Sequence, residues 1–230
     1  MVTTKPTPTT VELLIDQGKY YSFPVNDVEL KQSDIKYVDE WADDAAKQMK
    51  IEIETDVYGD IYSDADSSNA GASAGAISGD INLGVSGTPK TLTQENITDF
   101  IVDCGQALDE NNIPDEDRFI ILPAWACNYL KTSDLKNADL TGDAKSTLRT
   151  GNIGMIDRFD VYQSNLLNAT GGNFDGIFGQ KSALTFASQL TKNEMIDNPD
   201  DFGKLARGLQ VYGYKVIKAT ALGHAYITKG

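Results

Sequence analysis

The chain has a single histidine, His224, and two cysteines, Cys104 and Cys127, which limits the chemistry that its side chains can perform. A Ser-His-Asp or Cys-His hydrolase moves a proton through an imidazole and would have to use His224. The sequence has no Gly-x-Ser-x-Gly motif, and neither cysteine lies in a nucleophile motif. One histidine and two cysteines are also a poor ligand set for zinc. We therefore expect His224 to be a tail residue without a catalytic role, and we assign no catalytic, cofactor-binding or metal-binding residue.

The two cysteines leave two alternatives, free buried thiols or one disulfide bridge. Cys104 lies in a helical pattern and Cys127 in a segment that faces a predicted core. This placement favours free buried thiols. Two cysteines in 230 residues do not form the disulfide framework of a small secreted domain.

Acidic clusters are the remaining candidates for chemistry. Asp109–Glu110 with Asp115–Asp117 could bind calcium through carboxylate oxygens, although the spacing does not fit an EF-hand loop. The same applies to four aspartates at the end of a predicted helix: Asp56, Asp60, Asp64 and Asp66. A pair such as Asp157 and Asp160 could serve an acidic hydrolase, which would need a concave pocket and a carboxyl of raised pKa. Solvated acidic loops are the simpler interpretation of all these clusters.

The net charge of 20 − 34 = −14 indicates which partners are excluded. Residues 1–65 carry 6 basic and 14 acidic residues, and the remainder carries 14 and 20. Nucleic-acid binding needs clustered Lys and Arg, so tight DNA or RNA binding and docking on an anionic membrane are not expected. The sequence also has no apolar run of the roughly 20 residues that cross a bilayer.

The N-terminal part predicts two strands followed by one long helix. Val11–Ile15 and Tyr20–Val25 are short apolar runs separated by a turn-like Asp-Gln-Gly sequence. Apolar residues then recur every three or four positions over Asp34–Ile61, which predicts a helix of about 40 Å with one apolar face. That face comprises Ile35, Val38, Ala42, Ala45, Met49, Ile53, Val57 and Ile61. Such a helix is expected to lie across a sheet or another helix.

The remainder of the chain predicts an α+β arrangement. Ser63–Gly79 is rich in Ser, Ala and Gly, which predicts a domain junction or mobile loop. Its Gly71–Gly79 stretch lacks the Lys-Ser or Lys-Thr of a phosphate-binding loop. Two helices are expected, Thr93–Glu110 capped by Thr93, and a short one from Pro123 to Leu130. The expected strands are Phe119–Leu122, Gly154–Ile156, Phe159–Gln163, Phe174–Phe178, Ala183–Leu190 and Leu209–Lys218, the last extending toward Tyr226.

Aromatic residues gather in two of the predicted strands. Tyr20, Tyr21 and Phe23 precede the long helix, and Tyr212 and Tyr214 lie in the late strand. No basic residues are interleaved as in a base-stacking platform. We therefore interpret these side chains as sheet packing or as contacts between subunits.

Five segments, in order, resemble the major capsid proteins of tailed bacteriophages, whose fold is shared with herpesviruses. Leu148–Asn165 resembles the family's hairpin motif L-R-x-G-x-I-G-x-x-x-G-F-x-V-Y-x-S-N, with Arg158 where a glycine often stands. Gly208–Leu222 resembles its closing strand G-L-x-V-Y-G-x-K-V, with Ala219-Thr220 in place of the usual proline. The other three segments are Leu14–Glu29, Arg118–Leu130 and Ile177–Gln189.

The resemblance implies a phage major-capsid fold, with a long spine helix packed on a peripheral-domain sheet and a separate α+β axial domain. Residues 1–25 would form the end of an extended loop and peripheral strands, and residues 26–66 the peripheral domain with the spine helix. Residues 67–190 would form the axial domain, and residues 191–230 the return strands of the peripheral domain. The N-terminal arm and the first half of the extended loop would precede Met1, and in this fold both reach neighbouring subunits.

The implied function is structural and involves no enzyme activity, cofactor or metal. Copies in hexamers and pentamers would form the icosahedral head of a virion assembled in the bacterial host cytoplasm, with scaffolding, portal and decoration proteins as candidate partners. The shell would enclose double-stranded DNA without specific binding, because an acidic lining does not retain phosphates. Two alternatives remain: an encapsulin-type nanocompartment shell on the same fold, and the acidic hydrolase.

Overall fold

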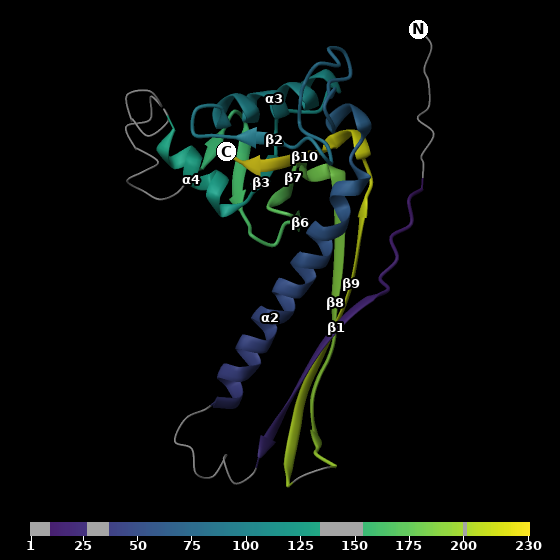
Figure 1. Cartoon of the computed structure of the whole chain (residues 1–230). Coiled ribbons are helices and arrows are strands. Elements are labelled where there is room, and N and C mark those ends of the chain that lie inside the picture. Colours follow the sequence, from purple (N-terminus) through teal and green to yellow (C-terminus); the bar gives the residue numbers. More distant parts are fainter. Residues whose placement is uncertain (1–9, 27–36, 134–153, 200–201) are drawn as a thin grey trace.

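The computed structural model describes residues 10–26, 37–133, 154–199 and 202–230, which form two bodies built on separate sheets (Figure 1). The elongated body contains helix α2 (Tyr37–Asp60) and strands β1 (Gln17–Asn26), β8 (Leu184–Asp197) and β9 (Gly203–Val216). The compact body contains helices α3 (Ile97–Glu110) and α4 (Ala124–Thr132) and strands β2 (Lys90–Leu92), β3 (Arg118–Leu122), β4 (Met155–Ile156), β5 (Phe159–Gln163), β6 (Ala169–Thr170), β7 (Asn173–Gln180) and β10 (Leu222–Lys229). Short 3-10 helices occur at η1 (Ile61–Asp64), η2 (Ser67–Asn69), η4 (Lys181–Ala183) and η5 (Ala219–Ala221).

The elongated body is an antiparallel sheet of order β1-β9-β8 with α2 on one face. The expected apolar face of the helix is confirmed, because Met49, Ile53 and Val57 are buried against the sheet. Helix α2 ends at Asp60, so Ile61 belongs to η1, and the expected start at residue 34 lies outside the described residues.

The predicted strand at Val11–Ile15 is wrong, whereas the strand predicted at Tyr20–Val25 is confirmed within β1. The Asp-Gln-Gly sequence does not form a turn, because Gln17 and Gly18 already pair with β9. Residues 11–16 instead cross β9, where the Leu14 carbonyl occupies the space that a Cβ on Gly213 would need. Glycine at this position therefore permits the close crossing.

The compact body is a mixed sheet of order β2-β10-β7-β3-β5-β4, and α3 and α4 pack with it around one core. The strand predicted at Phe159–Gln163 has the bounds of β5, and the other predicted strands of this body are also present. The start of α3 was expected at Thr93 but lies at Ile97. The cause is a local turn, in which the Asn96 side chain accepts a hydrogen bond from the Thr93 amide and donates one to the Thr91 carbonyl.

The C-terminal strands are distributed between the bodies differently from expectation. Strand β9 ends at Val216, and after η5 the chain forms β10, which pairs with β7 and β2 of the compact body. Residues 222–229, expected in the peripheral return strands, therefore lie in the larger sheet. Conversely β8 begins at Leu184, so residues 184–190, expected in the axial domain, belong to the three-stranded sheet.

The segment Ser63–Gly79 was expected to be a domain junction or a mobile loop, and it is a junction, because the chain passes through η1 and η2 from α2 into the compact body. The expectation that its small side chains could not order it is wrong. Asn69 and Ala74 are fully buried, and Ala74 pairs with Ile81. Polar groups in this segment form hydrogen bonds with residues at the end of α3. The small side chains allow close packing against the compact body.

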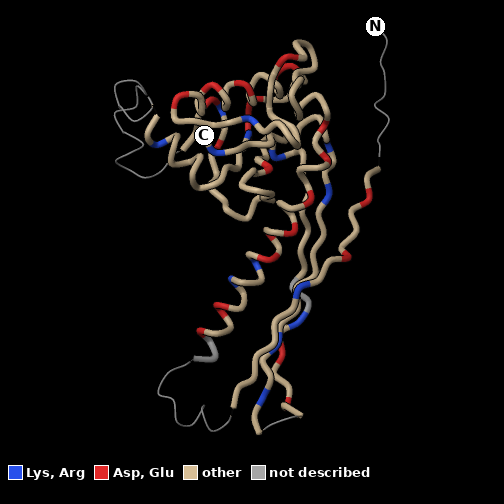
Figure 2. The backbone as a smooth tube through the Cα atoms, viewed as in Figure 1, with Lys and Arg blue, Asp and Glu red and all other residues tan. Residues whose placement is uncertain are grey.

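Charge is unevenly distributed along the elongated body (Figure 2). Helix α2 contains eight acidic residues and two lysines, whereas Lys and Arg recur along the strands. Among the helices that the structure describes, none is sufficiently long and apolar to cross a membrane.

Candidate functional site

Two arginines and two aspartates form an ion network where α3 meets the β4–β5 hairpin. Asp109 contacts Arg118 at 2.6 Å and Arg158 at 2.9 Å, and Asp115 contacts the same two arginines at 3.1 and 2.7 Å. Burial raises the pKa of Asp109, but hydrogen bonds from Arg158 and Arg118 outweigh it and hold that pKa below its ordinary value. Two of the carboxylates considered as calcium ligands, Asp109 and Asp115, are therefore paired with guanidinium groups.

Arg118 also organises the loop that follows α3. Its side chain is fully buried and donates hydrogen bonds to the carbonyls of Pro114 at 3.0 Å and Ile113 at 2.6 Å. A buried guanidinium is stable only when its donors are paired, so this loop depends on Arg118.

The glycine-rich loop is attached to the end of α3 by Glu110. Its carboxylate accepts hydrogen bonds from the Ile77 and Ser78 amides at 2.7 and 2.9 Å and from the Gln106 side chain at 2.8 Å. These bonds, that of Gln106 foremost, lower the pKa of Glu110 to about 2. The loop amides are thus directed at a carboxylate of the chain itself, which supports the absence of a phosphate-binding role.

The hydrolase alternative depends on the hollow beside the ion network. This hollow of about 460 Å³ is lined by Asp160 and by Asp115, Glu116, Asp117, Arg118, Met155 and Arg158. The other proposed carboxylate, Asp157, lies at 3.8 Å from Arg158 and contacts α3 at Gly105. Of the carboxylates that line the hollow, Asp115 is paired with both arginines and Asp117 with Lys181, as in a structural ion network.

Three of the four aspartates singled out near the end of α2 have separate partners. Asp56 accepts a hydrogen bond from the Tyr212 hydroxyl at 2.5 Å and pairs with Lys19 at 2.7 Å. Asp60 accepts one from the Tyr214 hydroxyl at 3.1 Å. The predicted packing role of these tyrosines is confirmed, because they connect α2 to β9. Asp66 caps η2 by accepting from the Ser68 amide at 2.9 Å.

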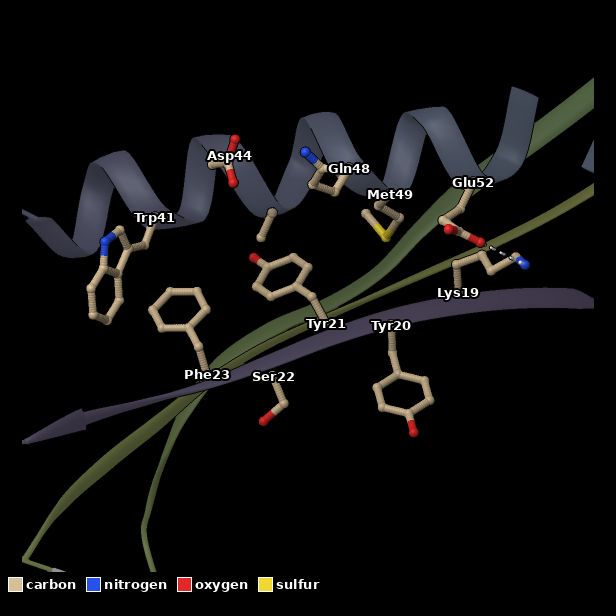
Figure 3. A pocket seen from close by; sticks show the side chains of 11 residues that line it. Lys19, Tyr20, Tyr21, Ser22, Phe23, Trp41, Asp44, Gln48, Met49 and Glu52 are labelled. Atoms are coloured by element: carbon tan, nitrogen blue, oxygen red, sulfur yellow. Dashed lines mark ion pairs between the residues drawn. The ribbon is translucent and has the colours of Figure 1, made fainter. Parts of the chain in front are cut away.

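A groove between α2 and β1 forms a concave surface of the elongated body (Figure 3). It has a volume of about 570 Å³ and is lined by Tyr21, Phe23, Trp41 and Met49, with Glu52 and Lys19 paired at 3.7 Å. The rings of Trp41 and Phe23 pack edge to face, with 5.8 Å between their centroids. On the opposite face of β1, Tyr20 is 80% exposed. These apolar surfaces have the composition of a contact between protein chains.

His224 is not a tail residue, because it lies in β10 within the larger sheet. Its Nε2 lies 2.7 Å from Oδ1 of buried Asp175, whose other oxygen accepts a hydrogen bond from Asn168 at 2.7 Å. The ring packs against Tyr62 of η1 with 5.1 Å between centroids. His224 thus contributes to the contact between η1 and the compact body.

Cys104 and Cys127 are free and buried, as expected. Burial raises the pKa of both thiols, to about 11 for Cys127. Within the described ranges, no group of three His, Cys, Asp or Glu side chains is arranged to hold a metal ion.

Two important residues, Arg118 and Asn69, were not identified from the sequence. A charged residue directly before the apolar run Phe119–Leu122 was an available signal, because a buried arginine requires carboxylate partners. Asn69 gave no such signal within a stretch of Ser, Asn and Ala.

Comparison with known proteins places the fold among viral shells. The profile of one family, described as phage capsid protein, matches residues 10–229. The structure is similar to that from Mycobacterium phage Che8, with a TM-score of 0.75 and 24% identity over 94% of this chain and 72% of the other. It is also similar to the capsid of cyanophage P-SCSP1u, with a TM-score of 0.69 and 15% identity over 99% and 78%. A third similar structure is the capsid of a native GTA particle, with a TM-score of 0.65 and 13% identity over 94% and 73%. Among curated proteins, no sequence match is significant.

Proposed function

Because the chain belongs to the phage capsid protein family, we propose that its copies form hexamers and pentamers that build the icosahedral head of a tailed bacteriophage. The family match over residues 10–229 carries this proposal, and the capsid fold agrees with it. The chain is a structural capsid subunit and a component of the virion. Its lack of enzyme activity is part of the proposal.

The two bodies correspond to the peripheral and axial domains of such a subunit. We assign α2 and the sheet β1-β9-β8 to the peripheral domain, and the sheet containing β10 and β7 to the axial domain. This division replaces the expected boundary between residues 190 and 191, because it follows strand pairing.

The family match does not favour a nanocompartment shell. For the hydrolase, Asp115 in the hollow is paired with Arg118 and Arg158, and a carboxylate held ionised in this way is a poor general acid. Assembly in the host cytoplasm and contact with scaffolding, portal and decoration proteins belong to the proposal as candidate properties.

The test is the assembly state of the chain at high concentration, measured by light scattering and negative-stain microscopy. We expect rings or closed shells. Tyr20→Asp is the informative variant, because a side chain that is 80% exposed contributes little to folding of a single chain. If Tyr20 is a subunit contact, this variant keeps the wild-type melting temperature and assembles less. Monomers of the unmodified chain at every concentration would contradict the proposal.

A further inference from the structure

The chain passes between the two bodies three times, and the three crossings lie together (Figure 1). The first crossing runs through η1 and η2, the second through η4, and the third through η5. The Ile217 amide of the third crossing donates to the Ala183 carbonyl of the second at 2.7 Å. The Asp66 amide of the first donates to the Ala219 carbonyl of the third at 3.2 Å. The bodies are therefore connected by three hydrogen-bonded segments.

One apolar cluster extends through this joint. It combines Ile61 after α2 with Tyr212 of β9, Ile177 of β7 and Leu222 of β10, all buried. Apolar contact holds the two bodies against each other, but it is non-directional and does not by itself define an angle between them.

Asn69 supplies directional bonds at the same joint. Its side chain is fully buried, and its Nδ2 donates to the carbonyls of Thr220 at 2.6 Å and Leu222 at 3.2 Å. Its Oδ1 accepts from the Asn111 side chain at 2.8 Å, and Asn111 also donates to the Ala107 carbonyl of α3 at 3.1 Å. A carboxamide is the group that can donate twice and accept once at this position.

We propose that Asn69 is a positioning residue for shell assembly, which fixes the angle between the two bodies by joining the first and third crossings to the end of α3. This inference rests on the proposed capsid function. The same joint is present in every copy of a shell, so a change in the angle that it favours recurs throughout the assembly and alters its curvature.

The angle can be measured on the unassembled full chain by the distance between two spin labels. Lys47→Cys on α2 and Asp99→Cys on α3 place the labels on exposed positions of the two bodies, while Cys104 and Cys127 are buried. The same variants, unlabelled, are then assembled, and particle diameters are measured by negative-stain microscopy.

The informative substitution is Asn69→Asp, which places carboxylate oxygens against two carbonyl oxygens. We expect the distribution of distances between the spin labels to shift or broaden. We also expect the assembled particles to vary in diameter instead of having one uniform diameter. Asn69→Ser keeps one hydroxyl donor and should show a smaller change of the same kind, and it decides the question if Asn69→Asp does not fold. Ser133→Ala is the matched control, because Ser133 is a buried polar residue at the end of α4, remote in sequence from the crossings.

The proposal is supported if the Asn69 variants change both readouts while Ser133→Ala, at a similar loss of melting temperature, changes neither. It is overturned if folded Asn69 variants keep the wild-type distance distribution or assemble at the wild-type diameter. Failure of the unmodified chain to assemble would instead count against the capsid function, and the label distance would still show whether Asn69 fixes the angle.

Discussion

Arg118 makes the strongest single-residue prediction, because its side chain is fully buried and its partners are two carboxylates, two loop carbonyls and the Gly105 carbonyl of α3. Arg118→Met keeps much of the aliphatic volume, leaves the loop carbonyls without this donor, and leaves Arg158 as the remaining guanidinium partner of the two carboxylates. We expect the free energy of unfolding to fall by about 3–5 kcal/mol in chemical denaturation. The control is Asp117→Asn, which breaks the exposed ion pair with Lys181 and should cost less than about 1 kcal/mol. If both variants lost the same free energy of unfolding, the buried network would stabilise the fold no more than the exposed ion pair does.

Asp56 makes a prediction about pH at the contact between α2 and β9. Burial raises the pKa of Asp56, but the hydrogen bonds from Lys19 and Tyr212 outweigh it, so the net pKa is lowered. A lowered carboxyl pKa stabilises the fold above the unfolded-state value of about 3.9, and this contribution is lost as the pH falls through the folded value. Asp56→Asn should therefore show a shallower loss of stability than the wild type below about pH 4. The exposed Asp43→Asn on the same helix should retain the wild-type slope, and thermal melts from pH 6 to pH 3 compare the three proteins.

The β4–β5 hairpin makes the prediction at the scale of elements. Asp157 and Arg158 form its turn with φ values of 43° and 68°, in the left-handed region that glycine adopts without strain. Arg158→Gly relieves this strain and removes half-exposed ion pairs, and we expect these effects to offset within about 1 kcal/mol. Arg158→Val loses the ion pairs and keeps a β-branched residue at positive φ, so it should cost about 2–3 kcal/mol. If both variants were equally destabilised in urea titrations, the ion pairs and not the turn would determine stability.

The elements also show how far a single sequence could predict this structure. The local patterns of α2 and β5 identified both, because apolar periodicity reports a buried face. The start of α3 was mispredicted because the Asn96 side chain makes a local turn that periodicity does not register. Strand β10 was missed as a separate strand because its partners, β7 and β2, are distant in sequence. The partners of Asn69 could not be predicted for the same reason, since Thr220, Leu222 and Asn111 are distant from it in sequence. Those of Arg118 are near in sequence, but apolar periodicity does not register the loop that brings them to its side chain.

At the scale of the whole molecule, two properties act against each other during assembly. Each copy carries a net charge of −14, so copies repel one another at low ionic strength. In the proposed assembly, the exposed apolar surfaces around Tyr20 and the groove at Trp41 would provide the opposing attraction. Many weak contacts per copy, acting together, can overcome the repulsion, and raised salt should assist assembly.

The same acidity predicts how the shell treats packaged DNA. An acidic lining releases no counterions from phosphate and therefore holds DNA only by enclosure. We expect lysines on the inner face to retain DNA after shells are opened at about 0.1 M salt, and this retention should fall steeply as salt is raised.

Two exposed acidic sets serve as test sites. One lies on α2 and comprises Glu40, Asp43 and Asp44, and the other lies on the compact body and comprises Asp80, Glu95 and Asp99. Each set is replaced by lysine in a separate variant, and DNA sedimenting with opened shells is measured against salt. Retention in the variant whose lysines face the lumen would support the acidic-lining mechanism and identify that face, because the outward set meets no packaged DNA. Wild-type release from both variants would mean that surface charge does not control how the genome is held.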